Sequence, residues 1–372
     1  MNMSDATSRR PRRAGRLSPL VWGIYGFAAL SGILHLTAIF SPRFADFFNR
    51  YIGAAVRAAL AALTAWIPFS LAEMLILSLP LIFVLLLRLA LRHYSESWRA
   101  VLRYCAGLLA GLLCFYIFFV WGFGTGYHAS TVEEKLGLDR RPVSAEELEQ
   151  TARYLVDRIA EERDSIAYRR DGFSVMPFSH TGMNDRLLDA YETICDRYSF
   201  VQRMHSRIKP VILSEPWTYT HIAGVYTYFT GESNLNMNFP DYTLPYTAAH
   251  ELAHQRGIAR EDEANFMAFL VCTASDDPYI RYSGYLNLYE YVASALYSAD
   301  PTRYFDVLES ISPAVRGEMA AYSAFFDRYR ETVVSEVSGA INDTYLKLQG
   351  TEGEKSYGRV VDLAVAWYKT QT

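Results

Sequence analysis

Three stretches in the first third of the chain are apolar over a length that can cross a membrane. They lie at about residues 20–40, 71–91 and 104–123. A hydrocarbon core of about 30 Å takes roughly 20 apolar residues of helix, so each stretch predicts a transmembrane helix. The first has a basic flank, as a signal peptide does, but it is long, and no small-residue cleavage site follows before Pro42. We therefore expect it to be retained as an anchor in a multi-pass membrane protein embedded in a lipid bilayer.

The segment between the first two stretches has a helical pattern of its own. Residues 47–66 are rich in Ala and Leu, and Arg50 and Arg57 lie seven residues apart on one side of the predicted helix. Such an amphipathic helix can lie in the plane of the membrane interface. A short helix that packs between the spans fits the pattern equally well.

After about residue 124 the pattern becomes that of an ordinary globular domain. Ser144 and Glu147 form a capping box that predicts a helix to about residue 164, and a second helix is predicted from residue 185 to about 206. Residues 217–238 alternate in polarity and are rich in Thr, Tyr and Val, which predicts strands and turns. Helical periodicity returns near residue 246 and continues with breaks to about residue 367.

The predicted fold class is α+β, mostly α, with one small sheet. We divide the chain into a basic tail (1–19), a three-span membrane region (20–123) and a carboxyl-terminal domain (124–372). Arginines are densest in the tail and in the loop between the second and third spans, and such loops face the cytoplasm. We therefore expect a cytoplasmic amino terminus and an extracytoplasmic carboxyl-terminal domain at the cell membrane.

Composition narrows the class of protein. Hydrophobic residues make up 51% of the chain, charged residues 20%, and the net charge is −4, which argues against a disordered or nucleic-acid-binding protein. Four cysteines without a CxxC pair are too few for a disulfide scaffold. Cys195 and Cys272 can pair if the domain is extracytoplasmic, although Cys272 reads more simply as a buried apolar residue.

The segment TAAHELAHQRG contains an HExxH motif. Residues four apart share one helix face, so His250 and His254 can both reach one ion. Zn²⁺ accepts imidazole nitrogen, and a catalytic zinc site keeps one position open for water. Glu251 lies one residue from the first histidine, where its carboxylate can take a proton from that water. Gly257 is placed to end the helix.

The next segment, AREDEANF, offers candidates for a third zinc ligand. A helix that starts near Arg260 would place Glu261 on one face with Asn265 and small residues, so that it can pack closely against the HELAH helix. Glu261 is the preferred ligand and Glu263 the alternative. Asn265, one turn beyond Glu261, is predicted to hydrogen-bond a ligating histidine.

HELAH followed by Glu261-Asp-Glu-Ala-Asn265 resembles the gluzincin zinc peptidases, in which HExxH is completed by a glutamate in an E-x-x-A-D or E-x-x-x-D pattern. Asn265 stands where the usual aspartate would be. The short gap from His254 to Glu261 is nearer to that of metzincins, whose third histidine would fall at Arg260 here, so the chain does not match that group. The resemblance implies a gluzincin-like zincin domain.

A wider resemblance covers nearly the whole chain. PFSLAEML, the stretch from VYTYFTGESNLNMNFPDYTLPYTAAHELAHQRG to EDEANF, and INDTYLKLQG are similar to the bacterial membrane family DUF3810. The family has no assigned function, so this resemblance implies the architecture rather than an activity.

The leading functional hypothesis is a membrane-anchored zinc metallopeptidase that hydrolyses peptide or protein substrates outside the cytoplasm or near the membrane. The alternatives are a non-catalytic sensor or assembly protein with a structural zinc site, and a metal-dependent hydrolase of a non-peptide bond. Residues 231–238 are a candidate edge strand for binding substrate backbone. Five residues are candidates for stabilising an oxyanion: His221, Arg281, Tyr282, Tyr285 and Tyr289.

Overall fold

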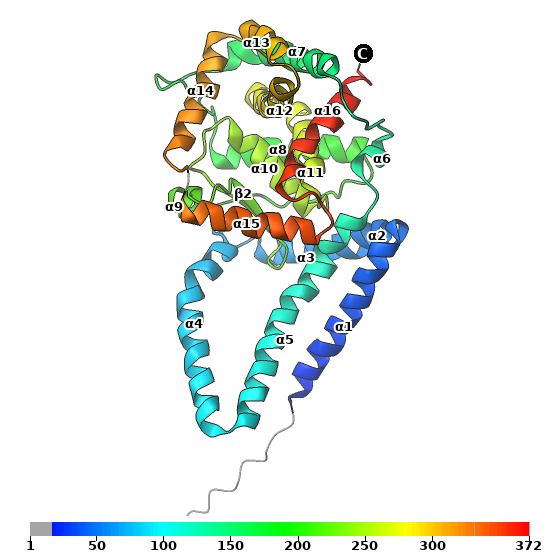
Figure 1. The fold of residues 1–372 in the computed structure, drawn as a ribbon, viewed down its shortest axis with the longest axis vertical. Coiled ribbons are helices and arrows are strands. Elements are labelled where there is room, and N and C mark those ends of the chain that lie inside the picture. The colour runs from blue at the N-terminus through cyan, green and yellow to red at the C-terminus, as the bar shows by residue number, and fades with distance from the viewer. Residues whose placement is uncertain (1–16, 331, 372) are drawn as a thin grey trace, which may run out of the picture.

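Three long apolar helices extend from one side of a helical domain. The computed structural model describes residues 17–330 and 332–371, so most of the basic tail lies outside the described residues. The helices α1 (Pro19–Phe40), α4 (Leu71–Glu96) and α5 (Trp98–Gly122) are each long and apolar enough to cross a membrane. In Figure 1 all three run downward from the domain, and α4 and α5 meet at their far ends in a tight hairpin. The three predicted spans are therefore present as apolar helices.

The segment between α1 and α4 packs against the domain through a buried arginine. It consists of α2 (Pro42–Phe47), a π-helical stretch η1 (Phe48–Gly53) and α3 (Ala54–Thr64). Arg57 is only 1% exposed, and its guanidinium donates to Asn49, Gln202 and the carbonyl of Gly122. Burial lowers the pKa of Arg57 to about 10. Arg57 therefore does not share an exposed face with Arg50, because its hydrogen-bond partners hold it inside the protein.

The core of the domain is a stack of long helices. It is built from α7 (Ala145–Glu162), α8 (His180–Arg197), α10 (Thr243–Gln255), α11 (Glu261–Thr273), α12 (Pro278–Ala299) and α16 (Val360–Tyr368). The remaining helices are shorter or peripheral: η2 (Gly124–His128), α6 (Val132–Leu136), η3 (Arg163–Ser165), α9 (Ser214–Thr218), α13 (Pro301–Ser310), α14 (Pro313–Asp327), α15 (Val333–Leu348) and η4 (Gly353–Arg359). Helix predominates and the sheet is small, as the sequence predicted.

Local sequence signals predicted the start of one helix correctly and the bounds of another inaccurately. The capping box of Ser144 and Glu147 is formed and opens α7, as predicted. The helix α8 begins at His180 rather than at residue 185, because the Ser179 side chain accepts from the backbone N–H of Gly182 and caps the helix there. It ends at Arg197, about nine residues before the predicted end.

The sheet has three short strands in the order β1-β3-β2. The central strand β3 (Glu232–Leu235) pairs in parallel with β1 (Lys209–Pro210) and antiparallel with β2 (Gly224–Thr227). The expectation that residues 231–238 form an edge strand is therefore wrong. A two-residue strand such as β1 has no periodicity that a sequence pattern can reveal, and it covers the side of β3 that was expected to be free. Within the described residues β2 is the edge strand beside α10.

Buried carboxylates tie the sheet to the domain end of α4. Glu73, in the first turn of α4, accepts from the backbone N–H groups of Ile212 and Leu213 at 2.9 and 2.7 Å. Glu232 of β3 accepts from the backbone N–H of Leu71 and pairs with Lys209. Hydrogen bonds to charged groups are stronger than neutral ones, so these contacts hold the sheet firmly on the apolar helix.

Candidate metal centre

The helix α10 carries the HExxH motif and ends where the glycine predicts. Gly257 has φ of 92°, a left-handed conformation that glycine adopts at no steric cost. The N–H of Ile258 then returns to the carbonyl of Ala253 at 3.1 Å and closes the helix. Asn49 of η1 donates to the carbonyl of Gly257 at 2.9 Å. The segment between α1 and α4 thus holds the carboxyl-terminal end of the motif helix in place.

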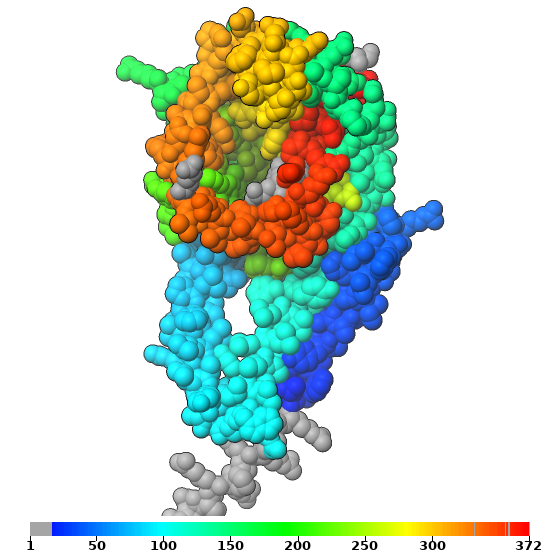
Figure 2. All heavy atoms as spheres, in the orientation of Figure 1, coloured from blue at the N-terminus to red at the C-terminus, as the bar shows by residue number. Residues whose placement is uncertain are grey.

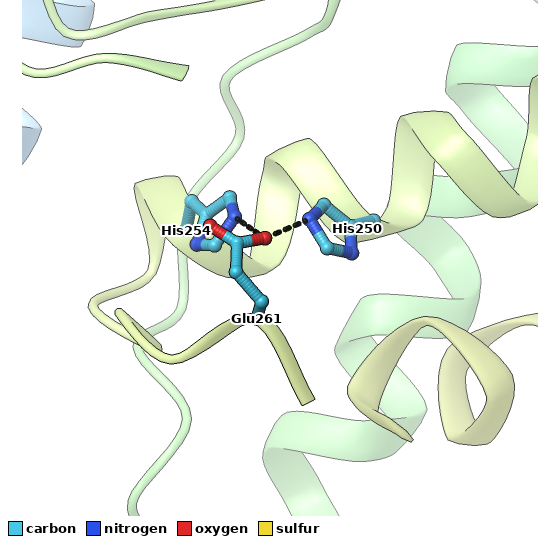
Figure 3. Close-up of side chains that lie close together, drawn as sticks. All are labelled: His250, His254 and Glu261. Atoms are coloured by element: carbon cyan, nitrogen blue, oxygen red, sulfur yellow. Dashed lines mark hydrogen bonds and ion pairs between the residues drawn. The ribbon is translucent and has the colours of Figure 1, made fainter. Parts of the chain in front are cut away.

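Two histidines and one glutamate converge at the junction of α10 and α11. One ligand atom from each of His250, His254 and Glu261 lies within 4.8 Å of the others, and all three residues are buried. Glu261 is the first residue of α11, and its Oε2 lies 3.2 Å from Nε2 of His250 and 3.4 Å from Nε2 of His254. Figure 3 shows both rings turned toward this one carboxylate oxygen. The predicted group of three is therefore brought together by the fold.

The second nitrogen of each ring determines which tautomer the histidine adopts. Nδ1 of His254 lies 2.8 Å from the carbonyl oxygen of Ile258, and Nδ1 of His250 lies 2.8 Å from Oδ1 of Asn265. Both partners are acceptors, so each Nδ1 carries a proton, and each Nε2 faces Glu261, where it donates as N–H or, once deprotonated, can offer its lone pair to a metal ion. Metal-binding histidines are oriented in this way by the group behind them. The contact expected between Asn265 and a histidine is present. The contact of His254 with the Ile258 carbonyl could not be predicted, because a backbone carbonyl leaves no pattern in the sequence.

The charges at this site favour a cation between the three side chains. Burial opposes ionisation of Glu261, but the neighbouring His254 and His250 outweigh it and hold the pKa of Glu261 well below its usual value. Burial likewise opposes a charge on His254, yet Glu261 raises the pKa of His254 to about 9. A positive charge beside it therefore stabilises the buried carboxylate, and either a proton on a histidine or a metal ion can provide that charge.

The other two acids of the segment are engaged elsewhere. Glu263 accepts from the backbone N–H of Val132 at 3.1 Å and pairs with Arg260 at 3.1 Å. Asp262 pairs with Arg140 at 2.8 Å. Successive helix positions differ by 100°, so Glu261 and Glu263 point in nearly opposite directions and only Glu261 reaches the histidines.

Glu251 lies beside the three-residue group, against the edge strand. Burial raises its pKa above the usual range of a glutamate, while the two histidines and the backbone N–H of Tyr226 oppose that rise. Gly224 of β2 makes room for this carboxylate, because a Cβ at residue 224 would lie 2.6 Å from Cγ and 2.8 Å from Oε1 of Glu251. No local sequence pattern marks Gly224, since its role depends on a contact between a strand and a helix.

Under the hydrolase hypothesis drawn from the sequence, replacing Gly224 by Ala is expected to displace the Glu251 carboxylate and to lower hydrolysis strongly without removing the metal. The added methyl group would overlap with the side chain of Glu251, and the adjacent strand holds the backbone in place. Gly317→Ala is the matched control, because a Cβ at residue 317 meets nothing within 4 Å. Turnover and metal content of both purified variants provide the test, and equal activity would contradict the role assigned to Gly224.

A large cavity opens onto these residues. Its volume is about 870 Å³, and β2, α10, α11, α12, α14 and α15 contribute to its walls. Figure 2 shows a hollow on this face of the domain, bordered by α14 in orange and α15 in orange-red. Glu251 and the three converging residues all lie on its wall. The site is therefore accessible to a molecule larger than water.

Most of the predicted oxyanion candidates lie away from this cavity. Arg281 pairs with Glu162, and the hydroxyl of Tyr282 bonds Glu318, so both serve the packing of α12. Of the five candidates only His221 contributes to the described walls. The tyrosines on the walls come from other positions: Tyr127, Tyr226, Tyr228, Tyr246, Tyr291, Tyr322 and Tyr345. Local residue spacing does not show which face of α12 packs against α7 and the rest of the core, so it could not predict which tyrosines line the cavity.

The cysteines do not form the pair that the sequence allowed. Cys195 and Cys272 are both free in the structure. Cys272 lies in α11 against α12, where a Cβ at Gly284 would come within 2.6 Å of the Cys272 Cβ. The small residue therefore serves a close helix contact with α12, in agreement with its interpretation as a buried apolar residue.

A family model described as "Protein of unknown function (DUF3810)" matches residues 48–365. The chain belongs to the DUF3810 family. The match starts at η1 and covers α4, α5, the sheet and the whole of the candidate metal centre. No curated protein and no solved structure matches the chain. For this DUF3810 protein, function must be inferred from the site.

Proposed function

We propose that this DUF3810 protein is a membrane-anchored zinc metallopeptidase. The main support is the convergence of His250, His254 and Glu261 within 4.8 Å, with both Nδ1 atoms already hydrogen-bonded. Two imidazoles and one carboxylate are a usual ligand set of catalytic zinc, and three protein ligands leave one position for water or substrate. A structural site needs a fourth protein ligand, and the nearby acids Asp262 and Glu263 are paired elsewhere. A catalytic site is thus favoured over the structural alternative.

The proposed chemistry uses Glu251 as the general base. A bound Zn²⁺ would supply Lewis acidity and make its water easier to deprotonate. Glu251 would take the proton from the attacking water and pass it to the amine that leaves. Burial raises the pKa of Glu251 in the direction of neutral pH. A group whose pKa lies nearer the working pH is better able both to accept and to return a proton.

The edge strand favours an extended peptide as substrate. β2 lines the cavity and lies directly beside Glu251, and within the described residues only its β3 side is paired. Backbone N–H and C=O groups on a free strand edge can bind an extended peptide as an additional strand. The site would therefore take peptide or protein substrates, presented outside the cytoplasm if the arginine pattern sets the orientation. Comparing the terminal peptides of cells that carry the wild type and Glu251→Gln would identify the substrates, and the absence of any difference would contradict peptidase activity.

Changing Glu261 to Ala is expected to lower zinc affinity much more than changing Glu263 to Ala. Glu261 alone of the two reaches the imidazoles, whereas Glu263 bonds Val132 and Arg260. Zinc titration of both purified variants in competition with a chelator gives the comparison. The reverse order would transfer the ligand assignment to Glu263.

Changing Asn265 to Ala is expected to weaken zinc binding by about 10- to 100-fold, the usual effect of removing the group behind a ligating histidine. The substitution removes the acceptor that holds Nδ1 of His250. Asn265→Asp keeps an acceptor oxygen at the same position and is expected to restore most of the affinity. Equal weakening by Ala and Asp would show that Asn265 serves packing rather than the orientation of His250.

The orientation in the membrane is a separate prediction. The domain lies at the end where α1 and α5 finish and α4 begins, so an odd number of spans places it opposite the amino terminus. A topology reporter fused after Thr372 is expected to be active outside the cytoplasm. A cytoplasmic signal would reverse the orientation that the arginines predict.

A further inference from the structure

The helix α15 has two faces of opposite character. Its inner face contributes Ser338, Asn342 and Tyr345 to the wall of the metal cavity. Its outer face carries a stripe of exposed apolar side chains, between 53% and 78% accessible: Val333, Val334, Val337, Ile341 and Leu348. At 100° per residue these five positions fall within about one third of the helix circumference. In an ordinary soluble protein the apolar face of a helix is mostly buried, so this stripe is far more exposed than usual.

Contacts at the carboxyl-terminal end of α15 locate it at the end of α5. The Tyr345 ring lies 6.2 Å from that of Phe119, which is one turn before the end of α5. The Tyr345 hydroxyl also accepts from that of Tyr127, in η2 directly after the span. This end of α15 is therefore at the depth where the apolar helix meets the domain.

The amino-terminal end of α15 lies near the start of α4. Thr332, the residue before α15, donates through its hydroxyl to the carbonyl of Tyr219. Tyr219 follows the short helix α9, which begins just after Leu213, whose backbone N–H bonds Glu73 in the first turn of α4. In Figure 1, α15 accordingly runs across the upper ends of α4 and α5, roughly at right angles to them.

We propose that α15 is an interfacial helix whose apolar stripe inserts into the surface of the bilayer that α1, α4 and α5 cross. The carboxyl-terminal end of α15 contacts α5 and η2 directly, and its amino-terminal end is connected to the start of α4 through Tyr219, α9 and Leu213. Exposed apolar side chains also lie on α3, directly after it, and just before α9: Leu63, Trp66, Ile212 and Leu213. Amphipathic helices bind membranes by burying such a stripe at the boundary of headgroups and acyl chains. The partner is the lipid bilayer itself.

The charged residues of α15 agree with this placement. Glu336, Asp343 and Lys347 fall on the flank between the apolar stripe and the cavity face. An apolar groove of about 580 Å³ follows the stripe and shares Ser338, Asn342 and Tyr345 with the metal cavity. One wall of the cavity therefore rests on the membrane. A further consequence rests on the proposed function: the peptidase would act on segments presented at the bilayer surface.

Spin labels on α15 test the placement without metal or turnover, so their result is independent of the proposed activity. The full chain is reconstituted in lipid vesicles with Cys105→Ala, Cys114→Ala and Cys195→Ala, while the fully buried Cys272 stays. Single labels are introduced by Val337→Cys and Ile341→Cys. The matched control is Phe305→Cys on α13, an equally exposed apolar position at the opposite end of the domain. Collisions with oxygen, which dissolves in lipid, are compared with collisions with a water-soluble nickel complex.

Labels at residues 337 and 341 are expected to show a several-fold higher ratio of oxygen to nickel collisions than the label at residue 305. Two results would overturn the proposal. Ratios equal to that of the control would place α15 in water. Protection from both reagents would mean that protein, a second copy or another chain, covers the stripe instead of lipid.

Discussion

Changing Glu251 to Gln is expected to abolish hydrolysis while the metal stays bound. The amide keeps the size of the side chain but cannot accept the proton of the attacking water, and a general base typically contributes about 10² to 10⁴ in rate. Glu251 points into the same cavity as His250, His254 and Glu261 without being one of the three converging residues. Zinc content should therefore remain at the wild-type level. Turnover of a substrate found by the terminal-peptide comparison and metal analysis of the same sample provide the measurement.

Glu290→Gln is the matched control for this experiment. Glu290 is also a buried glutamate, with a pKa that burial raises to about 7, but it accepts from the Tyr242 hydroxyl and lies outside the described walls of the cavity. Its amide can still accept that hydrogen bond, so activity is expected to persist. Unchanged turnover in Glu251→Gln would remove Glu251 from the mechanism. Loss of zinc from that variant would instead make Glu251 part of the binding site.

Changing both His250 and His254 to Ala is expected to reduce bound zinc from about one ion per chain to almost none. The two imidazoles supply two of the three converging ligand atoms, and metal affinity depends on all of them together. Glu261 would then be a buried carboxylate without a positive partner, a situation that typically costs about 3–5 kcal/mol of stability. Elemental analysis of purified protein and thermal unfolding of the same preparation provide the two readouts.

His205→Ala provides the control for non-specific loss, because His205 is exposed and lies outside the converging group. It is expected to keep its zinc and its unfolding temperature. Zinc retained at full level by the double variant would place the metal somewhere else in the chain. Absence of zinc from the wild type, when the protein is purified without chelators, would contradict the metal site itself.

Predictions that depend on short spacings agree best with the structure. The three apolar stretches form long helices, Ser144 and Glu147 cap α7, and Gly257 ends α10. Each depends on residues within one or two helical turns, so the sequence pattern contains most of the necessary information. The gluzincin-like assignment of the domain and the hydrolytic activity stay predictions.

Predictions that depend on long-range contacts were less complete. Residues 231–238 were expected to form an edge strand, whereas the strand β3 within them lies in the middle of the sheet, because β1 comes from residues 209–210. Arg57 was expected to share a face with Arg50 and is buried by its bonds to Asn49, Gln202 and Gly122. Such partners are separated by up to 145 residues in the chain, and no local periodicity records them.

By itself, the sequence determined which residues can carry the chemistry: two histidines one turn apart, a glutamate between them and acids soon afterwards, behind three apolar helices. Only the tertiary structure decided which of these acids faces the imidazoles, because that choice depends on how α11 packs against α10 and α12. It also decided that Gly224 makes room for Glu251 and that α15 closes one side of the cavity. The physical reason is that helix periodicity determines the direction in which each side chain of one helix points, whereas the packing between helices determines which residues that side chain contacts.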